Sequence, residues 1–537
     1  MAYTISEKGS DLTTINFKDV NGQDLPDKIP KVKQGSLSWM PNNKGIFYSK
    51  YIQTKKHSTN ESTITRKDEY HTLFYHPLGS KQDILIADFR ELDDPNLNIV
   101  GSVSRDGRFL FVYVYDRDNA NTIYYLDLNS INFKIHRRPP LTLLIHDTRA
   151  FFVILDYDHE TESAIVLTDH SAPNRKLIRI KITTAMLGCA HWETLIAEDP
   201  KRALESVVPV AGDKLMVIYI EDVKTFLYVH CYKTGKLLYK IPLGIGTVSQ
   251  CYGDREDTEA FFSFNSFLEA PTIYRADFSL VAKTSLLQLE QIPIFIIARK
   301  DVKRNGQNPT LLYGYGGFNI PVLPSYSSHR NIFVKLAIQG GSNGGLLVAA
   351  CSHQRPELFG AVINQVGVMD MLRFHKFTVG SFWISEYGDP EKSSEFEYIF
   401  RYSPLHNIRL PRGVQWPATL LITGDHDDRV VPSHTLKYAA QLYHYIKKSE
   451  IKLIQRNPIL VNIETNTGHG AGKPRDKIIE ELVDIMSFLQ RVLQLKCFTY
   501  GRLNVQFILN ISANDFLQIC IFAQFFSFPH STIIFLK

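Results

Sequence analysis

The 537-residue sequence lacks the patterns that mark metal sites, secretion signals and membrane spans. Its six cysteines form no Cys-x-x-Cys pair and join no histidine at metal-ligand spacing. Residues 1–11 are polar and contain no hydrophobic signal-peptide core. No apolar stretch reaches the roughly 18 residues that a transmembrane helix needs. We therefore expect free thiols in a cytoplasmic protein that binds no metal and no organic cofactor.

The sequence also lacks a strong charge of either sign. Its formal net charge is +5, and no block of lysine and arginine stands out. This small excess gives no reason to expect nucleic acid or a membrane surface as a partner. The hydrophobic content of 44% and the charged content of 21% are ordinary for a globular protein. At this length we expect about two to four domains.

The first half of the chain alternates short apolar strands with turns and contains almost no helical pattern. Five segments share one form, an apolar strand followed by a second strand that often carries tyrosine. Their spacing of roughly 45 to 60 residues fits four-stranded propeller blades with loops of variable length. A β-sandwich or a solenoid would also fit. The paired segments are 41–51 with 72–76, 104–115 with 122–128, 150–156 with 177–182, 211–220 with 226–232, and 259–264 with 272–276.

The pattern changes at about residue 286. The run 292–297 is continuously apolar, as in strands that are buried on both faces of a parallel sheet, and 310–313 is a second such run. Helical segments alternate with the strands, including 433–446 and 475–493. This alternation predicts a doubly wound, mostly parallel sheet.

A glycine-rich turn at residues 340–345 lies between an apolar strand and a helix-forming run. Ser342 stands within it, with glycine two residues away on each side. A serine whose hydroxyl must stand clear of a sheet needs such a turn, because its neighbours can have no bulk. The pattern Gly-x-Ser-x-Gly is weak alone. It predicts a nucleophile only if catalytic partners follow in the chain.

Two candidate partners do follow, in the order of the α/β-hydrolases. Asp427 comes after the apolar strand 420–422, and His469 lies in a glycine-flanked turn after the run 459–463. Each residue has an ordinary alternative: a turn serine, a helix-capping aspartate and a loop histidine. All three candidates nevertheless fall where a strand gives way to a loop, the edge on which ligands bind to an open α/β sheet.

Six motifs in order resemble the prolyl oligopeptidase family, and the resemblance covers residues from about 1 to 493. It implies a seven-bladed β-propeller joined to an α/β-hydrolase domain. In that family more of the catalytic domain precedes the propeller, whereas this sequence starts inside it, so we expect about five of seven blades. The motifs are Tyr-Gly-Tyr-Gly-Gly-Phe (313–318), Gly-Gly-Ser-Asn-Gly-Gly (340–345), Gln-Val-Gly-Val-Met-Asp (365–370), Tyr-Ser-Pro-Leu-His-Asn (402–407), His-Asp-Asp-Arg-Val-Val-Pro (426–432) and Gly-His-Gly-Ala-Gly-Lys-Pro (468–474).

Peptide hydrolysis assigns a role to each candidate residue. Ser342 would attack the peptide, His469 would act as general base and then acid, and Asp427 would orient the imidazole. The backbone N–H of Asn343 would be one oxyanion donor. The resemblance implies that the phenol of Tyr315 is the second donor; its alternative is a buried tyrosine that anchors its loop.

The resemblance further implies a proline-binding pocket. Trp383 would stack on the proline ring, and Arg429 would hold a substrate carbonyl by charge-assisted hydrogen bonds. The alternative for Arg429 is an ion pair with an acid such as Asp428. The other pocket residues would be Phe318, Val368, Tyr387 and Val430.

Two stretches depart from the family pattern. Residues 319–341 are too few for the two helices and two strands of the hydrolase plan, which need on the order of 50 residues. One strand and one helix are thus expected to be missing. The missing strand would belong between 292–297 and 310–313, and its loss would leave both with unpaired edges. Residues 498–537 are rich in phenylalanine and isoleucine without a clear period; we favour translated non-coding or misassembled sequence over a membrane-surface or partner-binding tail.

The sequence therefore predicts a truncated β-propeller over residues 1–280, an α/β-hydrolase domain over 286–497, and a hydrophobic tail over 498–537. The predicted activity is that of a monomeric serine endopeptidase that cuts short peptides on the carboxyl side of proline. Two alternatives stay open. One is an oligopeptidase specific for basic residues, which would carry acids in place of Trp383 and its apolar neighbours. The other is an inactive homologue that acts as a binding scaffold.

Overall fold

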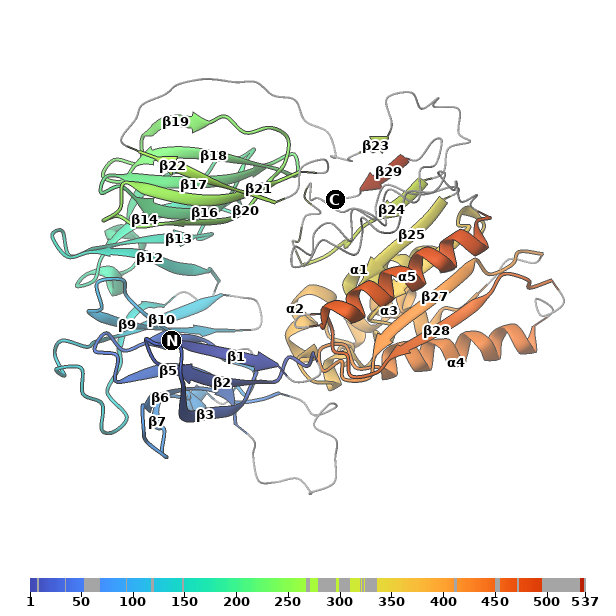
Figure 1. Cartoon of the computed structure of the whole chain (residues 1–537), viewed down its shortest axis with the longest axis horizontal. Helices are drawn as coiled ribbons and strands as arrows, with labels where there is room; N and C mark the ends of the chain where they lie inside the picture. The colour runs from blue at the N-terminus through green and yellow to red at the C-terminus, as the bar shows by residue number, and fades with distance from the viewer. Residues whose placement is uncertain are drawn as a thin grey trace. The chain divides into compact units, whose positions relative to one another are not determined.

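The computed structural model of the chain contains two units with different secondary structure (Figure 1). The first unit holds Met1–Asn265, Pro271–Leu289 and Thr378–Ser385, and the second holds Ser266–Ala270, Glu290–Phe377 and Glu386–Lys537. The structure describes residues 1–6, 9–33, 35–52, 68–92, 94–116, 120–146, 149–266, 271–278, 296–298, 310–318, 320, 323, 336–409, 413–449, 454–470, 473–494 and 532–535.

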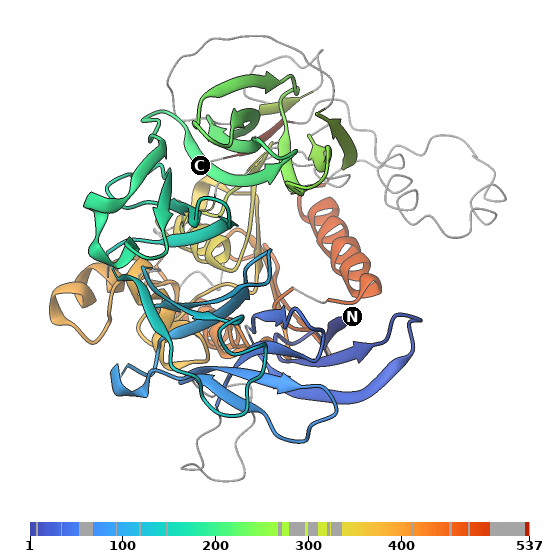
Figure 2. The ribbon, with the colours of Figure 1, turned by 90° about the vertical axis from the view of Figure 1, so that its left-hand side faces the viewer.

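Six antiparallel sheets make up the first unit, and they follow the chain from blue to green in Figure 2. Strands that are consecutive in sequence are neighbours in each sheet, as in propeller blades. The sheets are formed by β1 (Ala2–Ser6), β2 (Thr13–Lys18) and β3 (Asp24–Val32); β4 (Leu37–Trp39), β5 (Gly45–Tyr51), β6 (His71–Pro77) and β7 (Ile84–Ala87); β8 (Asn98–Val103), β9 (Phe109–Tyr115), β10 (Asn121–Asp127) and β11 (Thr142–His146); β12 (Phe152–Asp158), β13 (Ser163–Thr168), β14 (Lys176–Lys181) and β15 (Glu193–Ile196); β16 (Ala203–Val210), β17 (Lys214–Glu221), β18 (Lys224–Cys231) and β19 (Leu237–Ile241); and β20 (Thr247–Gly253), β21 (Glu259–Asn265) and β22 (Thr272–Asp277).

The apolar cores of the first unit lie between successive sheets. Strand β9 shows why, because side chains alternate between the two faces of a strand. Phe109, Phe111 and Tyr113 pack toward the sheet β12–β15, whereas Leu110 and Val112 pack toward the sheet β4–β7. Five such clusters join the six sheets in the order of the chain, from β1–β3 to β20–β22.

Five of the six sheets contain the five predicted strand pairs. The sheet β1–β3 was not predicted, so the expectation of about five blades missed one sheet. Its third strand, Asp24–Val32, carries prolines and charged residues in place of an alternating apolar pattern. Pairing with β2, rather than the character of its own side chains, makes this segment a strand.

The second unit contains one seven-stranded sheet, in the order β23-β29-β24-β25-β26-β27-β28. The strands from β24 to β28 are parallel to their neighbours. They are β23 (Ile296–Ala298), β24 (Thr310–Tyr313), β25 (Leu336–Gly341), β26 (Ala361–Gln365), β27 (Ala418–Gly424), β28 (Ile459–Glu464) and β29 (Thr532–Phe535). The α-helices are α1 (Asn343–Gln354), α2 (Ile384–Tyr387), α3 (Ser393–Tyr402), α4 (Ser433–Lys448) and α5 (Arg475–Val492). Short 3-10 helices are η1 (Arg90–Leu92), η2 (Ala185–Leu187), η3 (Cys189–His191), η5 (Pro356–Leu358), η6 (Phe374–Lys376), η7 (Gly380–Trp383) and η8 (Pro404–His406).

Helices cover both faces of this sheet. On one face, Ile485 and Leu489 of α5 pack against Leu420 and Ile422 of β27. On the other face, the neighbouring residue Leu421 packs with residues of α1 and α4. A strand that is apolar on both faces needs such double cover, so the continuous apolar runs of the sequence correspond to a doubly wound sheet.

Strand β29 corrects the expectation of unpaired edges. It lies between β23 and β24, antiparallel to the first and parallel to the second. The backbone of Thr532–Phe535 therefore pairs with both strands that were expected to lack a neighbour. The helix that we expect to be missing would belong to the segment 319–335, which lies largely outside the described residues. The rest of the predicted tail, 498–531, also lies outside them.

Candidate active site

Ser342 occupies the sharp turn between β25 and α1. Its φ of 56° and ψ of −117° lie in a region that non-glycine residues rarely adopt. A Cβ at Gly340 would overlap the carbonyl oxygen of Gly344, and a Cβ at Gly344 would lie 2.7 Å from the carbonyl oxygen of Gly314. The glycines beside the serine are thus required by close backbone approach. The Ser342 amide donates to the carbonyl of Gln365 at 2.9 Å, which ties the turn to β26.

Asp427 and His469 form a hydrogen-bonded pair at the ends of β27 and β28. The His469 Nδ1 atom lies 2.8 Å from Asp427 Oδ2, and the exposed fractions of their side chains are 7% and 0%. The other carboxylate oxygen, Oδ1, accepts the amides of Arg429 at 3.0 Å and Val430 at 2.9 Å. Backbone donors therefore fix the carboxylate, and the carboxylate fixes the imidazole ring.

The carboxyl ends of β25, β27 and β28 lie at one edge of the parallel sheet, so Ser342, Asp427 and His469 share that edge. Strand β26 lies between β25 and β27 and ends at the same edge. The loop that follows it starts at Val366, whose φ of 44° is unusual for a β-branched residue. Backbone strain therefore occurs twice at this edge. Among the described residues, His469 is bonded to Asp427, but no hydrogen bond joins it to Ser342.

The Ser342 side chain lies close to the phenol of Tyr315. Burial raises the pKa of Tyr315 above its ordinary value, while the Ser342 hydroxyl and the charge of Arg429 act in the opposite direction. The phenol thus keeps its proton at neutral pH and can donate it to an oxyanion. The Tyr315 carbonyl accepts the side-chain amide of Asn343 at 2.6 Å, so the loop after β24 is tied to the start of α1.

Two predicted pocket residues, Phe318 and Tyr387, belong to an aromatic cluster within the second unit. The ring of Tyr387 contacts Phe318 and Phe374 edge-on, each at a centroid distance of 5.2 Å. Its hydroxyl donates to Oδ1 of Asn343 at 2.7 Å. Burial raises the pKa of Tyr387, so this hydroxyl remains a donor. Tyr387 therefore holds the residue whose amide is the predicted oxyanion donor.

Two residues of this cluster were missed by sequence reasoning. Phe374 belongs to η6, four residues beyond a recognised motif, and its sequence context gives no further signal. Glu386 accepts the amide of Phe318 at 2.6 Å and so holds that residue at a φ of 56°. An exposed glutamate beside a tyrosine carries no sequence signal for this contact.

The remaining predicted residues differ in their exposure and position. Val368 and Val430 are buried, each 1% exposed, and Arg429 is half-buried beside Asp427. The Val368 amide donates to the Ser342 carbonyl at 3.4 Å. Trp383 ends η7 in the segment Thr378–Ser385, which belongs to the first unit, whereas Ser342 belongs to the second. Trp383 and the other predicted pocket residues therefore belong to different units.

Metal ligands and disulfides do not contribute to the part of the site that the structure describes. No group of three histidine, cysteine or acidic residues placed to hold a metal occurs among the described residues. Four described cysteines are free thiols: Cys189, Cys231, Cys251 and Cys351. The other two, Cys497 and Cys520, lie outside the described residues. The helices that the structure describes are too short or too polar to cross a membrane.

A serine elbow and a buried Asp–His pair at one edge of a doubly wound sheet are the arrangement of an α/β-hydrolase. Here that domain is joined to a β-propeller. Comparison with known proteins agrees: residues 1–287 match the prolyl oligopeptidase N-terminal β-propeller domain, and residues 330–496 match the prolyl oligopeptidase family.

Individual relatives resemble the chain over most of its length. A prolyl endopeptidase of Elizabethkingia miricola is 31% identical over 91% of this chain and 76% of its own. A structure from a study of two prolyl endopeptidases has a TM-score of 0.78 at 29% identity, covering 92% of this chain and 80% of that one. Prolyl oligopeptidase B of Galerina marginata, bound to a 35mer hydrolysis and macrocyclization substrate, has a TM-score of 0.77 at 25% identity, covering 92% and 78%. The chain belongs to the prolyl oligopeptidase family and is a serine peptidase, which confirms the predicted family and fold class.

Proposed function

We propose that this chain hydrolyses short peptides on the carboxyl side of proline by a triad of Ser342, Asp427 and His469. The observation that carries the proposal is the buried His469–Asp427 pair, with its 2.8 Å contact, at the sheet edge that also holds the Ser342 elbow. A cytoplasmic location and a monomeric state stay predictions.

The chemistry begins at Ser342. Its hydroxyl turns toward Nε2 of His469, by rotation about Cα–Cβ, and attacks the peptide carbonyl. His469 takes the proton, and the carboxylate of Asp427 stabilises the resulting imidazolium. The phenol of Tyr315 and the backbone N–H of Asn343 then donate to the oxyanion. His469 returns the proton to the leaving amine, and water completes hydrolysis of the acyl-enzyme.

Proline specificity is supported by the aromatic cluster and by the relatives named prolyl endopeptidases. The flat indole of Trp383 suits a compact ring that has no hydrogen-bond donor. Phe318 and Tyr387 present further aromatic surface, and Arg429 can hold a substrate carbonyl. Val368 and Val430, which are both buried, would add apolar surface to this pocket.

A second candidate is the specificity for basic residues, because Glu386 places a carboxylate beside Phe318. That carboxylate is occupied by the Phe318 amide, which favours the proline specificity. Matched fluorogenic substrates that end in proline or arginine before the scissile bond separate the two. We expect efficient cleavage of the proline substrate only. Faster cleavage of the arginine substrate that is lost in Glu386→Gln would favour the second candidate.

The nucleophile is tested with a fluorophosphonate probe, which reacts with activated serines. We expect labelling at Ser342 and none in Ser342→Ala. Ser352→Ala is the control, because Ser352 is a buried serine of α1 whose hydroxyl bonds within the helix. Persistent labelling of Ser342→Ala would overturn the assignment. Trp383→Ala should raise KM by about tenfold and leave probe labelling unchanged, since it removes contact with the substrate only.

A further inference from the structure

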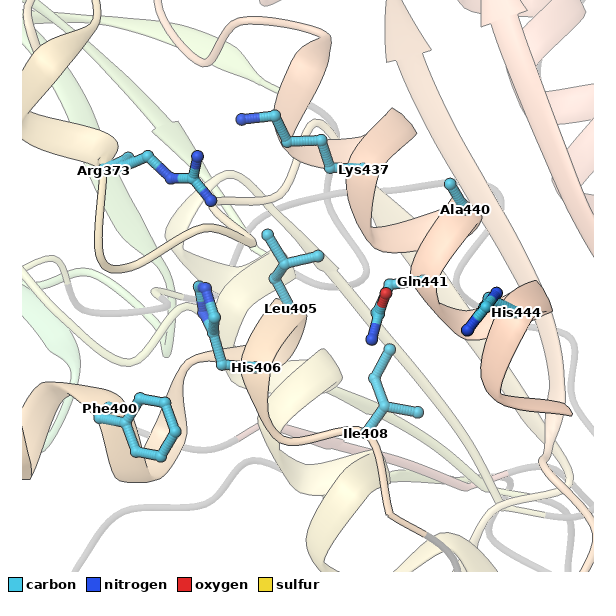
Figure 3. Close-up of a pocket in the computed structure, with 9 residues that line it drawn as sticks. All are labelled: Arg373, Phe400, Leu405, His406, Ile408, Lys437, Ala440, Gln441 and His444. Carbon is cyan, nitrogen blue, oxygen red and sulfur yellow. The ribbon is translucent and has the colours of Figure 1, made fainter. Parts of the chain in front are cut away.

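A cavity of about 750 Å³ lies on the second unit, and its lining residues include none of the proposed triad (Figure 3). One wall is a face of α4 that carries Lys437, Gln441 and His444 at helical spacing. The opposite wall comes from the loop after β26, the end of α3 and the η8 segment. Its volume falls in the range of small-molecule sites, roughly 300 to 1,000 Å³.

The polar groups that line the cavity are mainly hydrogen-bond donors. They include Arg373, Lys437, His406 and His444, and no aspartate or glutamate is among the described residues that line the cavity. Arg373 and Lys437 lie at the same end of it (Figure 3). An arginine and a lysine at one end of a cavity attract an anionic group.

Asp370 lies behind these two cations and only partly neutralises them. Its side chain is 1% exposed, and Oδ2 lies 3.1 Å from Nε of Arg373 and 3.5 Å from Nζ of Lys437. Arg373 uses Nε for this contact, which leaves its two terminal nitrogens for a ligand. One carboxylate against two cations leaves an excess positive charge at this end of the cavity.

His406 adds a neutral donor. Its Nδ1 lies 2.8 Å from the hydroxyl of Ser403, which accepts the amide of Met371 at 3.2 Å. Ser403 is fully buried, so its own proton needs an acceptor, and Nδ1 is the acceptor within reach. Burial also lowers the pKa of His406. The neutral ring then carries its proton on Nε2 and can donate it to a ligand.

The rest of the cavity is apolar. Phe400, Leu405 and Ile408 line it, and the Phe400 ring packs against His406 at a centroid distance of 6.0 Å. A ligand that fits therefore has an anionic head and a compact apolar body. An inorganic anion would leave this apolar surface uncovered.

We propose that this cavity binds a short peptide through its free C-terminal carboxylate, with an apolar last residue. Arg373 and Lys437 hold the carboxylate, His406 donates to it, and Phe400, Leu405 and Ile408 cover the last side chain. Under the proposed function, hydrolysis after proline would release peptides of this kind. Binding itself needs no turnover, so it can be measured separately from catalysis.

The test is calorimetric titration of the Ser342→Ala chain at low salt with acetyl-alanyl-proline, its C-terminal amide, and inorganic phosphate. We expect the free acid to bind at least about tenfold more tightly than the amide or phosphate, because only the acid offers both the charge and the apolar ring. Equal binding of acid and amide would overturn the proposal. Tighter binding of phosphate would replace a peptide site by a simple anion site.

Charge-matched variants of α4 locate the binding. Lys437→Gln should weaken it at least about tenfold, and Gln441→Glu should weaken it too by placing an acid in the cavity while Asp370 keeps both partners. The control is Lys447→Gln, an exposed change of the same charge on the same helix outside the cavity. If Lys437→Gln and Lys447→Gln bind equally well, the peptide occupies another site, including the catalytic one, and the proposal is wrong.

Discussion

The two halves of the seven-stranded sheet are built from different parts of the chain. Strands β25 to β28, here called the sequential half, are consecutive in sequence and alternate with helices. The composite half consists of β23, β29 and β24, where β29 comes from residues 532–535. The sequential half carries all three proposed triad residues. The composite half leads, through β24, to Tyr315 and to the pocket residue Phe318.

This difference separates two parts of the proposed reaction. Proton transfer depends on the sequential half, whereas the second oxyanion donor depends on the composite half. The hydrogen bond from Asn343 to the carbonyl of Tyr315 joins the two at 2.6 Å. Variants in each half should therefore fail in different ways.

The largest effect is expected for Asp427→Asn in the sequential half. The amide would favour the wrong tautomer of His469, so kcat should fall by roughly 10,000-fold with little change in KM. Turnover of a proline-ended fluorogenic peptide measures this. The control is Asp476→Asn, an exposed change in the first turn of α5. A loss below about tenfold would show that Asp427 does not orient the base.

Tyr315→Phe should cost roughly 100- to 1,000-fold in kcat, the loss typical of one oxyanion donor. Its dependence on pH is informative, because burial raises the pKa of Tyr315. The phenol remains protonated through its ordinary pKa of about 10, so the advantage of wild type over this variant should persist to pH 10. If Tyr315 only anchors its loop, Tyr315→Phe should lower the stability of the protein and leave kcat per probe-titrated site unchanged.

A smaller effect is expected for Ile533→Pro in the composite half. Proline has no N–H for the ladder of a central strand, so β24 should lose pairing and Tyr315 should lose its fixed position. We expect kcat per probe-titrated site to fall by about tenfold, less than for Tyr315→Phe because the phenol is still present. Ile533→Val is the matched control.

The double variant Tyr315→Phe with Ile533→Pro sharpens this comparison. If β29 acts through Tyr315, the second substitution should add nothing to the first. A further loss of similar size in the double variant would mean that the strand acts on the site by another route.

The last effect is on stability and not on kcat, and it concerns the helix that covers the sequential half. Burial lowers the pKa of His434 to about 4, and its Nδ1 accepts the amide of Asp370 at 3.0 Å. In the unfolded chain His434 binds a proton below about pH 6.5, whereas in the folded chain it binds one only near pH 4. The contribution of neutral His434 to the free energy of unfolding is therefore fully present above pH 6.5 and decreases toward pH 4, by about 3 kcal/mol in all.

Urea unfolding between pH 7 and pH 5 measures this dependence. His434→Gln keeps an acceptor for Asp370 and should flatten it. His444→Gln, which changes an exposed histidine of the same helix, should leave it as in wild type. Equal slopes for His434→Gln and wild type would contradict the assignment.

Sequence reasoning located the features that depend on local sterics. A serine between glycines can form only a sharp turn, and polar residues after apolar strands fall at one sheet edge. The placement of Ser342, Asp427 and His469 followed from these rules. Contacts between distant segments were not predictable, because no local pattern encodes them: the Glu386 bond to Phe318 and the Tyr387 bond to Asn343 are examples. The sheet β1–β3 and the pairing of β29 depend in the same way on partners supplied by the rest of the fold.

The position of β29 also bears on the order in which the sheet can fold. Thr310 of β24 pairs with Leu336 on one side and with Thr532 on the other. The first pairing can form early during synthesis, whereas the second closes a loop that spans most of the second unit and costs about 2 kcal/mol more in chain entropy. The sequential half can thus assemble while one edge of β24 is still open, and an open edge can pair with other chains. Aggregation during synthesis is therefore expected to depend on how soon residues 532–535 reach that edge.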